Sequence, residues 1–294
     1  MYTKIYNYFD RLLFISQSPR SLALLRIILS SLILLFSVPP ISWILNLATV
    51  NETFIKPNLI IELFQFLLGD GILLNLLFIK IIYALLVLSG FFTVLGLFSK
   101  YSIPLLAFFY IFIVAYMWSF GEVHHPRSVL CWFFIILALS QRSSDTYSLD
   151  AYFGFTKVQN DLWKYGWPNS MLIIALSSAY CFSGLWKLFY QGGIEWLNGY
   201  TLQYYIVSKG DNFFTNFIIG KQWLLVFLSF FSIALEILFP LAVLFRKYSK
   251  WILLAAFLFH LGNYLLRGEN GIFILWPLIA IGYSFSLDKL IRLK

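Results

Sequence analysis

Long apolar stretches, rarely interrupted by charge, recur along the whole 294-residue chain. A helix needs about 20 mostly apolar residues to cross a bilayer, and slightly fewer when aromatic and basic side chains anchor its ends. Residues 58–68 are too few to span and carry Glu62, so we expect an interfacial or re-entrant helix there. Eight stretches meet or approach the required length: 21–38, 72–97, 102–119, 128–140, 168–189, 222–245, 251–266 and 271–287. The sequence therefore predicts an all-α fold, a polytopic bundle of about eight transmembrane helices.

Composition indicates that lipid is the solvent of this chain. Hydrophobic residues make up 61% of it and charged residues only 12%, about half the charged share of an ordinary soluble domain. A soluble globule cannot hide so much apolar surface. We therefore expect a multi-pass protein of the cell membrane whose main partner is the lipid bilayer.

The distribution of basic residues predicts the orientation, because Lys and Arg accumulate in cytoplasmic loops. With the N-terminus inside, 13 of them are cytoplasmic, 5 are outside and 3 lie within spans. The five outside are Lys56, Arg127, Lys209, Lys221 and Arg267. Both termini are thus predicted to be cytoplasmic. We expect residues 1–20 to form an amphipathic cytoplasmic segment, 21–288 a single transmembrane domain and 289–294 a short basic cytoplasmic tail.

Several function classes find no support in the sequence. The net charge of +8 is scattered between apolar runs, whereas a nucleic-acid binder concentrates its basic residues in one stripe or groove. Cys131 and Cys181 lie far apart with no CxxC spacing, and the histidines lack the HExxH spacing of a metal site. We therefore expect neither a nucleic-acid partner nor a metal.

Ionisable residues inside the predicted spans are the candidates for function. A charge at bilayer depth costs about 2.5 to 3.5 kcal/mol on insertion scales, so such a residue faces the interior, finds a partner or marks a site. Five residues qualify: Arg26, Lys80, Lys187, Glu236 and His260. A second group lies at the outer end of the fourth run: His124, His125 and Arg127. On the predicted topology Lys80, Lys187 and His260 fall in the outer halves of their helices, which suggests one site near the outer leaflet.

Each candidate also has a structural explanation. Lys187 lies near a helix end, from which a lysine can extend to water; His260 can be a hydrogen-bonded core residue, and Glu236 can simply pair with a lysine. The functional interpretation is that an amine desolvated among apolar side chains acts as a base near neutral pH, with a histidine as its partner. An outward cavity rimmed by Trp186, Trp196 and Tyr200 would suit a flat quinone ring or an apolar peptide segment. The alternative for these aromatic residues is an interfacial belt.

One segment carries a family resemblance. YCFSGLWKLFYQGGIEWLNGYTLQYYI, residues 180–206, resembles the signature of HTTM proteins, the membrane-domain family that includes the vitamin K-dependent gamma-carboxylases. That signature is an aromatic, a small residue, Gly-x-x-Lys-Leu and then Trp-x-x-Gly. Other segments resemble the family in the same order: SLALLRIIL at 21–29, HHPRSVL at 124–130, YSLDA at 147–151, LEILFPL at 235–241 and FHLGNYLL at 259–266.

The resemblance implies roles for particular residues. In the carboxylases the motif lysine deprotonates reduced vitamin K on the lumenal side and a histidine assists it; by position these correspond to Lys187 and to His125, with His124 as the alternative. The large extramembrane region of the carboxylases has no counterpart here. In size the chain is similar to stand-alone members of the sporulation-delaying B type, which act with a soluble partner in maturing a secreted peptide toxin. We therefore expect a role in peptide modification or maturation and toxin export, with a reduced quinone as cofactor, or alternatively a non-catalytic scaffold or lipid- or quinone-binding subunit.

Overall fold

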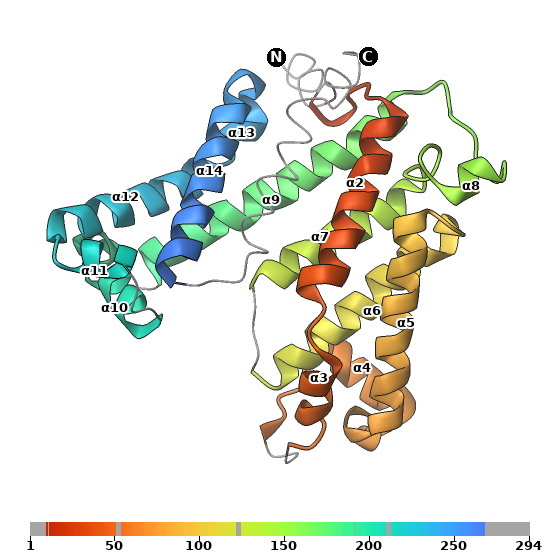
Figure 1. Cartoon of the computed structure of the whole chain (residues 1–294), viewed down its shortest axis with the longest axis horizontal. Helices are drawn as coiled ribbons and strands as arrows, with labels where there is room; N and C mark the ends of the chain where they lie inside the picture. Colours follow the sequence, from red (N-terminus) through yellow and green to blue (C-terminus); the bar gives the residue numbers. More distant parts are fainter. Residues whose placement is uncertain are drawn as a thin grey trace. The chain divides into compact units, whose positions relative to one another are not determined.

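The computed structural model describes residues 10, 12–50, 54–121, 125–190, 192–209 and 213–267. These residues form helices joined by turns and loops, with no strand among them, which confirms the all-α prediction. The chain divides into two compact units, residues 15–168 and residues 1–14 with 169–294. The boundary falls inside helix α9 (Trp163–Phe189) at Pro168, which lacks the N–H that an interior helical residue donates (Figure 1).

Helix α6 (Ser99–Ser119) lies at the centre of the unit formed by residues 15–168. Tyr110, Phe112 and Tyr116 of this helix are almost completely buried. It packs against α5, α7 and α4, and α2 packs against α5. The other elements of this unit are α2 (Pro19–Leu32) with a π-helical turn (Ile33–Ser37), α3 (Ile41–Leu47), α4 (Leu59–Leu68), a 3-10 turn (Asp70–Leu74), α5 (Leu76–Leu95), α7 (His125–Ser140) and α8 (Leu149–Tyr152).

Helix α5 shows why this unit requires a lipid environment. Its buried face includes Ile79 and Leu86, and its exposed face includes Leu77, Ile81 and Leu88. A surface helix of a soluble protein is polar on its exposed face. Here both faces are equally apolar, as expected of a helix that faces other helices on one side and lipid tails on the other.

The unit that contains residues 169–267 is built around α12 (Gln222–Leu238). This helix packs against α10, α11, α14 and the 3-10 turn, and α10 also contacts α14. The larger part of α9 also belongs to this unit. Its other elements are a 3-10 turn (Gly193–Asn198), α10 (Tyr200–Lys209), α11 (Phe213–Ile219), α13 (Leu241–Leu244) and α14 (Arg246–Arg267).

Four helices in the described part of the chain are long and apolar enough to cross a membrane: Pro19–Ser37, Leu76–Leu95, Ser99–Ser119 and Trp163–Phe189. Helices α11 and α12 become a fifth candidate if the pair, bent by 104°, is one span. Leu59–Leu68, Arg127–Ser140 and Trp251–Leu266 are shorter apolar helices. The predicted run 271–287 and the predicted tail 289–294 lie outside the described residues, as does half of the segment 1–20. Eight spans thus stay a prediction.

A buried arginine joins three parts of the unit formed by residues 15–168, called the first unit from here on. Arg26 on α2 is fully buried, and its guanidinium donates to the carbonyl of Thr93 at 3.1 Å and to that of Tyr147 at 2.6 Å. Tyr147 has a φ of 47°, a left-handed conformation that is costly for an aromatic residue. Gly96 also permits the contact, since a Cβ built there would lie 1.9 Å from the guanidinium. The backbone of this loop is therefore shaped around the arginine.

Asp150 holds the same loop against the start of α6. Its carboxylate accepts the backbone N–H groups of Phe98 at 2.8 Å and Ser99 at 2.7 Å, donors that have no partner within the helix. Its own N–H donates to the carbonyl of Gly96 at 2.9 Å, and Figure 1 shows α8 beside the turn between α5 and α6. A carboxylate at this end also interacts favourably with the helix dipole. Asp150 thus acts as a cap supplied from about 50 residues away.

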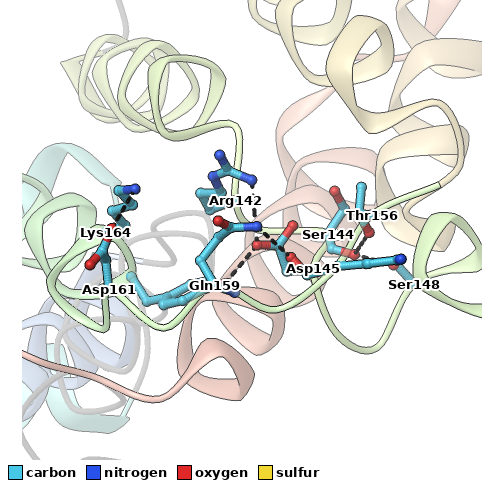
Figure 2. Close-up of polar contacts among 10 residues, drawn as sticks. Arg142, Ser144, Asp145, Ser148, Thr156, Gln159, Asp161 and Lys164 are labelled. Atoms are coloured by element: carbon cyan, nitrogen blue, oxygen red, sulfur yellow. Dashed lines mark hydrogen bonds and ion pairs between the residues drawn. The ribbon is translucent and has the colours of Figure 1, made fainter. Parts of the chain in front are cut away.

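A second buried carboxylate, Asp145, organises the loop after α7 (Figure 2). It accepts a hydrogen bond from the Tyr165 hydroxyl at 2.7 Å, and Arg142 lies 3.9 Å away. The Tyr165 oxygen in turn accepts the N–H of Gln159 at 2.8 Å. Burial raises the pKa of the Asp145 carboxyl, because desolvation disfavours the charged form more than the tyrosine and arginine favour it.

We expect Asp150→Ala to lower the free energy of unfolding by about 2 kcal/mol, because two backbone donors lose a charged acceptor. Thermal unfolding of the detergent-solubilised protein would show this as a lower melting temperature. Asp161→Ala is the control, since Asp161 is exposed and pairs with Lys164 at the surface, where little change is expected. Equal melting temperatures for the two variants would contradict the capping role.

We expect the substitution Asp145→Asn to stabilise the protein at pH 8 and to have no such effect near pH 4. The folded protein holds the Asp145 proton more tightly than the unfolded chain does, so stability is lost as the pH rises from the unfolded pKa of about 3.9 through the raised folded value. Asparagine keeps an acceptor for Tyr165 and cannot ionise. Melting temperatures measured across this pH range test the idea, and a less stable variant at pH 8 would refute it.

Candidate functional site

Three residues of the HTTM-like segment share one face of α9. Tyr180, Gly184 and Lys187 are spaced by four and three residues, which places them in line along a helix. Each contacts a different partner: Tyr180 meets α14, Gly184 meets the backbone of α12, and Lys187 meets a carboxylate of α12. This face of α9 is therefore the centre of the candidate site.

Lys187 forms a salt bridge with Glu236 of α12. The lysine Nζ lies 2.6 Å from Oε1 and 2.8 Å from Oε2, and the two side chains are only 17% and 6% exposed. The Ser183 hydroxyl also hydrogen-bonds to the carboxylate. A buried charge needs such partners, because removing an ion from water is costly. Of the alternatives that the sequence left open for Glu236, the structure therefore shows pairing with a lysine.

Gly184, three residues before Lys187, explains how the carboxylate of Glu236 comes within reach of the lysine amine. A Cβ at Gly184 would lie 2.8 Å from the Ile237 side chain and 3.0 Å from the Cβ of Glu236. Small residues allow membrane helices to approach closely. Gly184 thus lets α9 and α12 come near enough for their charged side chains to pair.

The Trp-x-x-Gly part of the motif covers the same amine. Trp196 is 6% exposed, and the Nζ of Lys187 lies 5.1 Å from the centroid of its ring, within the range of a cation–π contact. Gly199 has a φ of 84°, and a Cβ there would lie 2.9 Å from the backbone of Leu225 in α12. The second motif glycine therefore seats the tryptophan turn on the helix that carries Glu236.

A tyrosine–histidine pair lies on the same face of α9. The Tyr180 hydroxyl and the Nε2 of His260 are hydrogen-bonded at 2.5 Å, and the Tyr180 ring stacks on Phe239 with centroids 4.2 Å apart. Both members are close enough to interact electrostatically with the ion pair: Tyr180 with Glu236 and His260 with Lys187. His260 is therefore a hydrogen-bonded core residue that also belongs to the charged cluster.

This arrangement permits a definite chemistry. While the amine donates to both oxygens of Glu236 it holds its proton, so it has no lone pair with which to accept another. Passing that proton to the carboxylate gives a neutral amine beside a neutral acid, a state that a water-poor site favours over two separated charges. The proton can therefore move between Lys187 and Glu236 without changing the net charge of the pair, and a further proton taken from a bound group would raise that charge by one.

Other predicted site residues in this unit face outward. Trp186 is 55% exposed and stacks on Tyr190, with ring centroids 4.5 Å apart. Tyr200 is 62% exposed at the start of α10. Their positions fit an interfacial belt, one of the two explanations that the sequence allowed.

The remaining predicted residues belong to the first unit. Arg127 of α7 lies 5.7 Å from the Trp43 ring and contacts the sulfur of Met117; Lys80 is exposed on α5, and Arg26 lies in the junction described above. His125 is the first residue of α7. His124 and the side chain of His125 lie outside what the structure describes, so pairing of either with Lys187 stays a prediction.

Sequence reasoning missed Tyr180, Phe239 and the roles of the two motif glycines. The spacing of Tyr180, Gly184 and Lys187 along one helix face was a signal that could have identified the tyrosine. Phe239 had no such signal, because it lies just past the end of α12 and its contact with Tyr180 depends on how the helices pack. Within the described residues, no group of three His, Cys, Asp or Glu side chains lies close enough to bind a metal ion.

These features define a helical membrane protein with a charged cluster buried inside one of its units. The chain belongs to the HTTM family: the model of the HTTM domain matches residues 14–284. That match confirms the resemblance seen in the sequence motifs and covers residues of both compact units. No curated protein and no solved structure matches the chain.

We expect Gly184→Ala to destabilise the protein by about 1 to 3 kcal/mol, because the new methyl group would press α12 away from α9. Gly262→Ala is a matched control in α14, where a Cβ would meet nothing within 4 Å and alanine favours the helix. Melting temperatures in detergent distinguish the two. If Gly184→Ala were as stable as Gly262→Ala, the close approach of α9 and α12 would be wrong.

Proposed function

We propose that this HTTM protein acts in the modification or maturation of a secreted peptide at the extracytoplasmic side of the cell membrane. Lys187 is the catalytic base in this proposal, and the partners are a peptide substrate and a small soluble protein. The proposal includes the topology derived from the basic residues: eight spans, one transmembrane domain and both termini in the cytoplasm.

The observation that carries this proposal is the burial of the Lys187 amine among Glu236 and Trp196. Trp196 covers this amine, and the motif glycines Gly184 and Gly199 bring α9 and the tryptophan turn against α12, which carries Glu236. Glycine, lysine and tryptophan would not be needed together merely to keep two helices in a bilayer, since apolar packing does that at less cost. This arrangement supports a chemical role for the amine.

In this role Glu236 takes the lysine proton and the freed amine then accepts one from a bound group. Trp196 covers one side of the amine and excludes water, while the Ser183 hydroxyl holds the carboxylate in place. His125, or His124, assists the base by analogy with the family motif. His260 and Tyr180 contribute a polar wall beside the pair. Arg127, Lys80 and Arg26 are proposed as supporting residues of the site and not as proton carriers.

A reduced quinone of the vitamin K type is the cofactor that the resemblance implies. In this proposal the flat ring of the cofactor lies against Trp196, whose ring covers the amine, whereas the exposed Trp186 and Tyr200 belong to the interfacial belt. When bound, such a group supplies an acidic hydroxyl. The chain's own residues then need only orient that hydroxyl and hold the proton at Nζ of Lys187 or on the carboxylate of Glu236.

The salt bridge also favours a second function, that of a non-catalytic scaffold or lipid- or quinone-binding subunit of a larger complex. A Lys–Glu pair between α9 and α12 fixes which faces of the two helices meet, and buried polar pairs in other systems specify such a register. In that case the pair serves assembly alone.

The two functions predict different outcomes for a double substitution. We expect Lys187→Ala to abolish peptide maturation and to destabilise the protein by about 3 to 5 kcal/mol, because Glu236 is left buried and unpaired. The double variant Lys187→Met/Glu236→Met removes both charges and is expected to restore stability but not activity. Lys187→Arg keeps the charge and is expected to insert normally and to remain inactive. Peptide maturation in cells and melting temperatures in detergent are the two measurements.

Lys56→Ala is the control, since this exposed lysine belongs to the same predicted outer side. Full maturation by the double methionine variant would remove the catalytic proposal and leave the scaffold. Loss of both stability and activity in that variant, with full activity in Lys187→Arg, would likewise assign the pair to structure.

A further inference from the structure

An exposed patch of aromatic and basic residues lies at the end of the first unit where α5 meets α6. It is formed by Phe98 and Lys100 at the start of α6, by Tyr152 at the end of α8 and by Phe153, Phe155 and Lys157 from the loop that follows. We call these six residues the aromatic–basic face. None of them has a part in the site around Lys187.

Ring contacts make this face continuous across two segments of the chain. Phe98 and Phe155 stack with centroids 6.4 Å apart and planes 14° from parallel, and Phe153 lies 5.8 Å from Phe155. Lys100 and Lys157 are exposed two residues after Phe98 and Phe155, and the Nζ of Lys100 lies 5.9 Å from the centroid of the neighbouring Tyr101 ring. Asp150, which caps α6, holds the two segments together.

The fold gives this face a positive charge that the sequence does not show. Residues 141–164 carry three basic and three acidic residues, so the loop is formally neutral. Asp145 and Asp150 are each only 3% exposed, and Asp161 pairs with Lys164 at 2.7 Å. Because Asp145 and Asp150 are buried and Asp161 is paired, the exposed Lys157 and Lys100 give this face its charge.

The face also continues the lipid-exposed side of α5. Helices α5 and α6 are both candidate spans, so the turn that joins them lies at a membrane surface. Leu88, Phe91 and Leu95 form the exposed stripe of α5 that leads to Phe98. Tyr152 is 82% exposed and Phe155 is 63% exposed, a degree of exposure that large rings rarely show in water.

We propose that the aromatic–basic face binds anionic phospholipids. The aromatic rings enter the boundary between headgroups and acyl chains, where such rings are favourable. The amines of Lys100 and Lys157 pair with lipid phosphates above them, an attraction that neutral lipids offer much less strongly. This proposal depends on the membrane embedding of the chain and not on the proposed peptide activity.

The test uses the full-length protein purified in a non-ionic detergent and titrated with phosphatidylglycerol or phosphatidylcholine. A lipid that binds the folded state raises the melting temperature in proportion to its affinity. We expect phosphatidylglycerol to raise it at lower concentration than phosphatidylcholine, and the difference to shrink as salt is added. Lys100→Gln/Lys157→Gln is expected to need at least about fivefold more phosphatidylglycerol for the same shift.

Lys56→Gln/Lys221→Gln loses the same charge elsewhere and is expected to titrate like the unmodified protein. Lys100→Arg/Lys157→Arg keeps the charge and is expected to retain the response to phosphatidylglycerol. Equal responses to the two lipids would overturn the proposal and leave the face for a protein partner. An equal loss in both glutamine variants would overturn it too, because the effect would then come from net charge alone.

Discussion

A charged side chain at bilayer depth has to find partners inside the protein, and this requirement determines how the HTTM-like motifs are arranged within each unit. Arg26 finds backbone carbonyls at the end of α5 and in the loop before α8. Lys187 finds the carboxylate of Glu236. In each case an unpaired buried charge would cost more free energy than the strained backbone or close helix packing that allows the charge to be paired. The left-handed Tyr147 and the close approach at Gly184 are results of that balance.

Glycines provide the room for these contacts. Gly96 leaves space for the guanidinium of Arg26, and Gly184 and Gly199 leave space for α12. A side chain at any of the three would meet atoms closer than van der Waals contact allows. The motif glycines Gly184 and Gly199 therefore make room for the helix whose Glu236 pairs with Lys187.

The family motifs divide between two tasks. The segments around Arg26 and YSLDA meet one another in the first unit, where Ser148 caps α8 and Asp150 caps α6. The Gly-x-x-Lys, Trp-x-x-Gly, LEILFPL and FHLGNYLL segments supply Lys187, Trp196, Glu236 and His260 in the second unit. The first group stabilises the fold at one end of its unit. The second builds the charged cluster on which the proposed chemistry depends.

Hydrophobic runs, motif order and composition were enough to predict helices, a membrane environment and the family, because these properties are local or additive along the chain. The helix predicted within 58–68 is observed as α4 (Leu59–Leu68), and the run at 21–38 as α2 with its π-helical turn. Lys187 and Glu236 could be named as candidates from their unfavourable position in lipid alone. Their mutual pairing, the tyrosine bonded to His260, the outward position of Lys80 and the burial of Asp145 and Asp150 could not. Those depend on which helix faces and loops meet, and neither the apolar runs around the helical residues nor the polar loop around the two aspartates specifies their partners, so only the tertiary packing decides them.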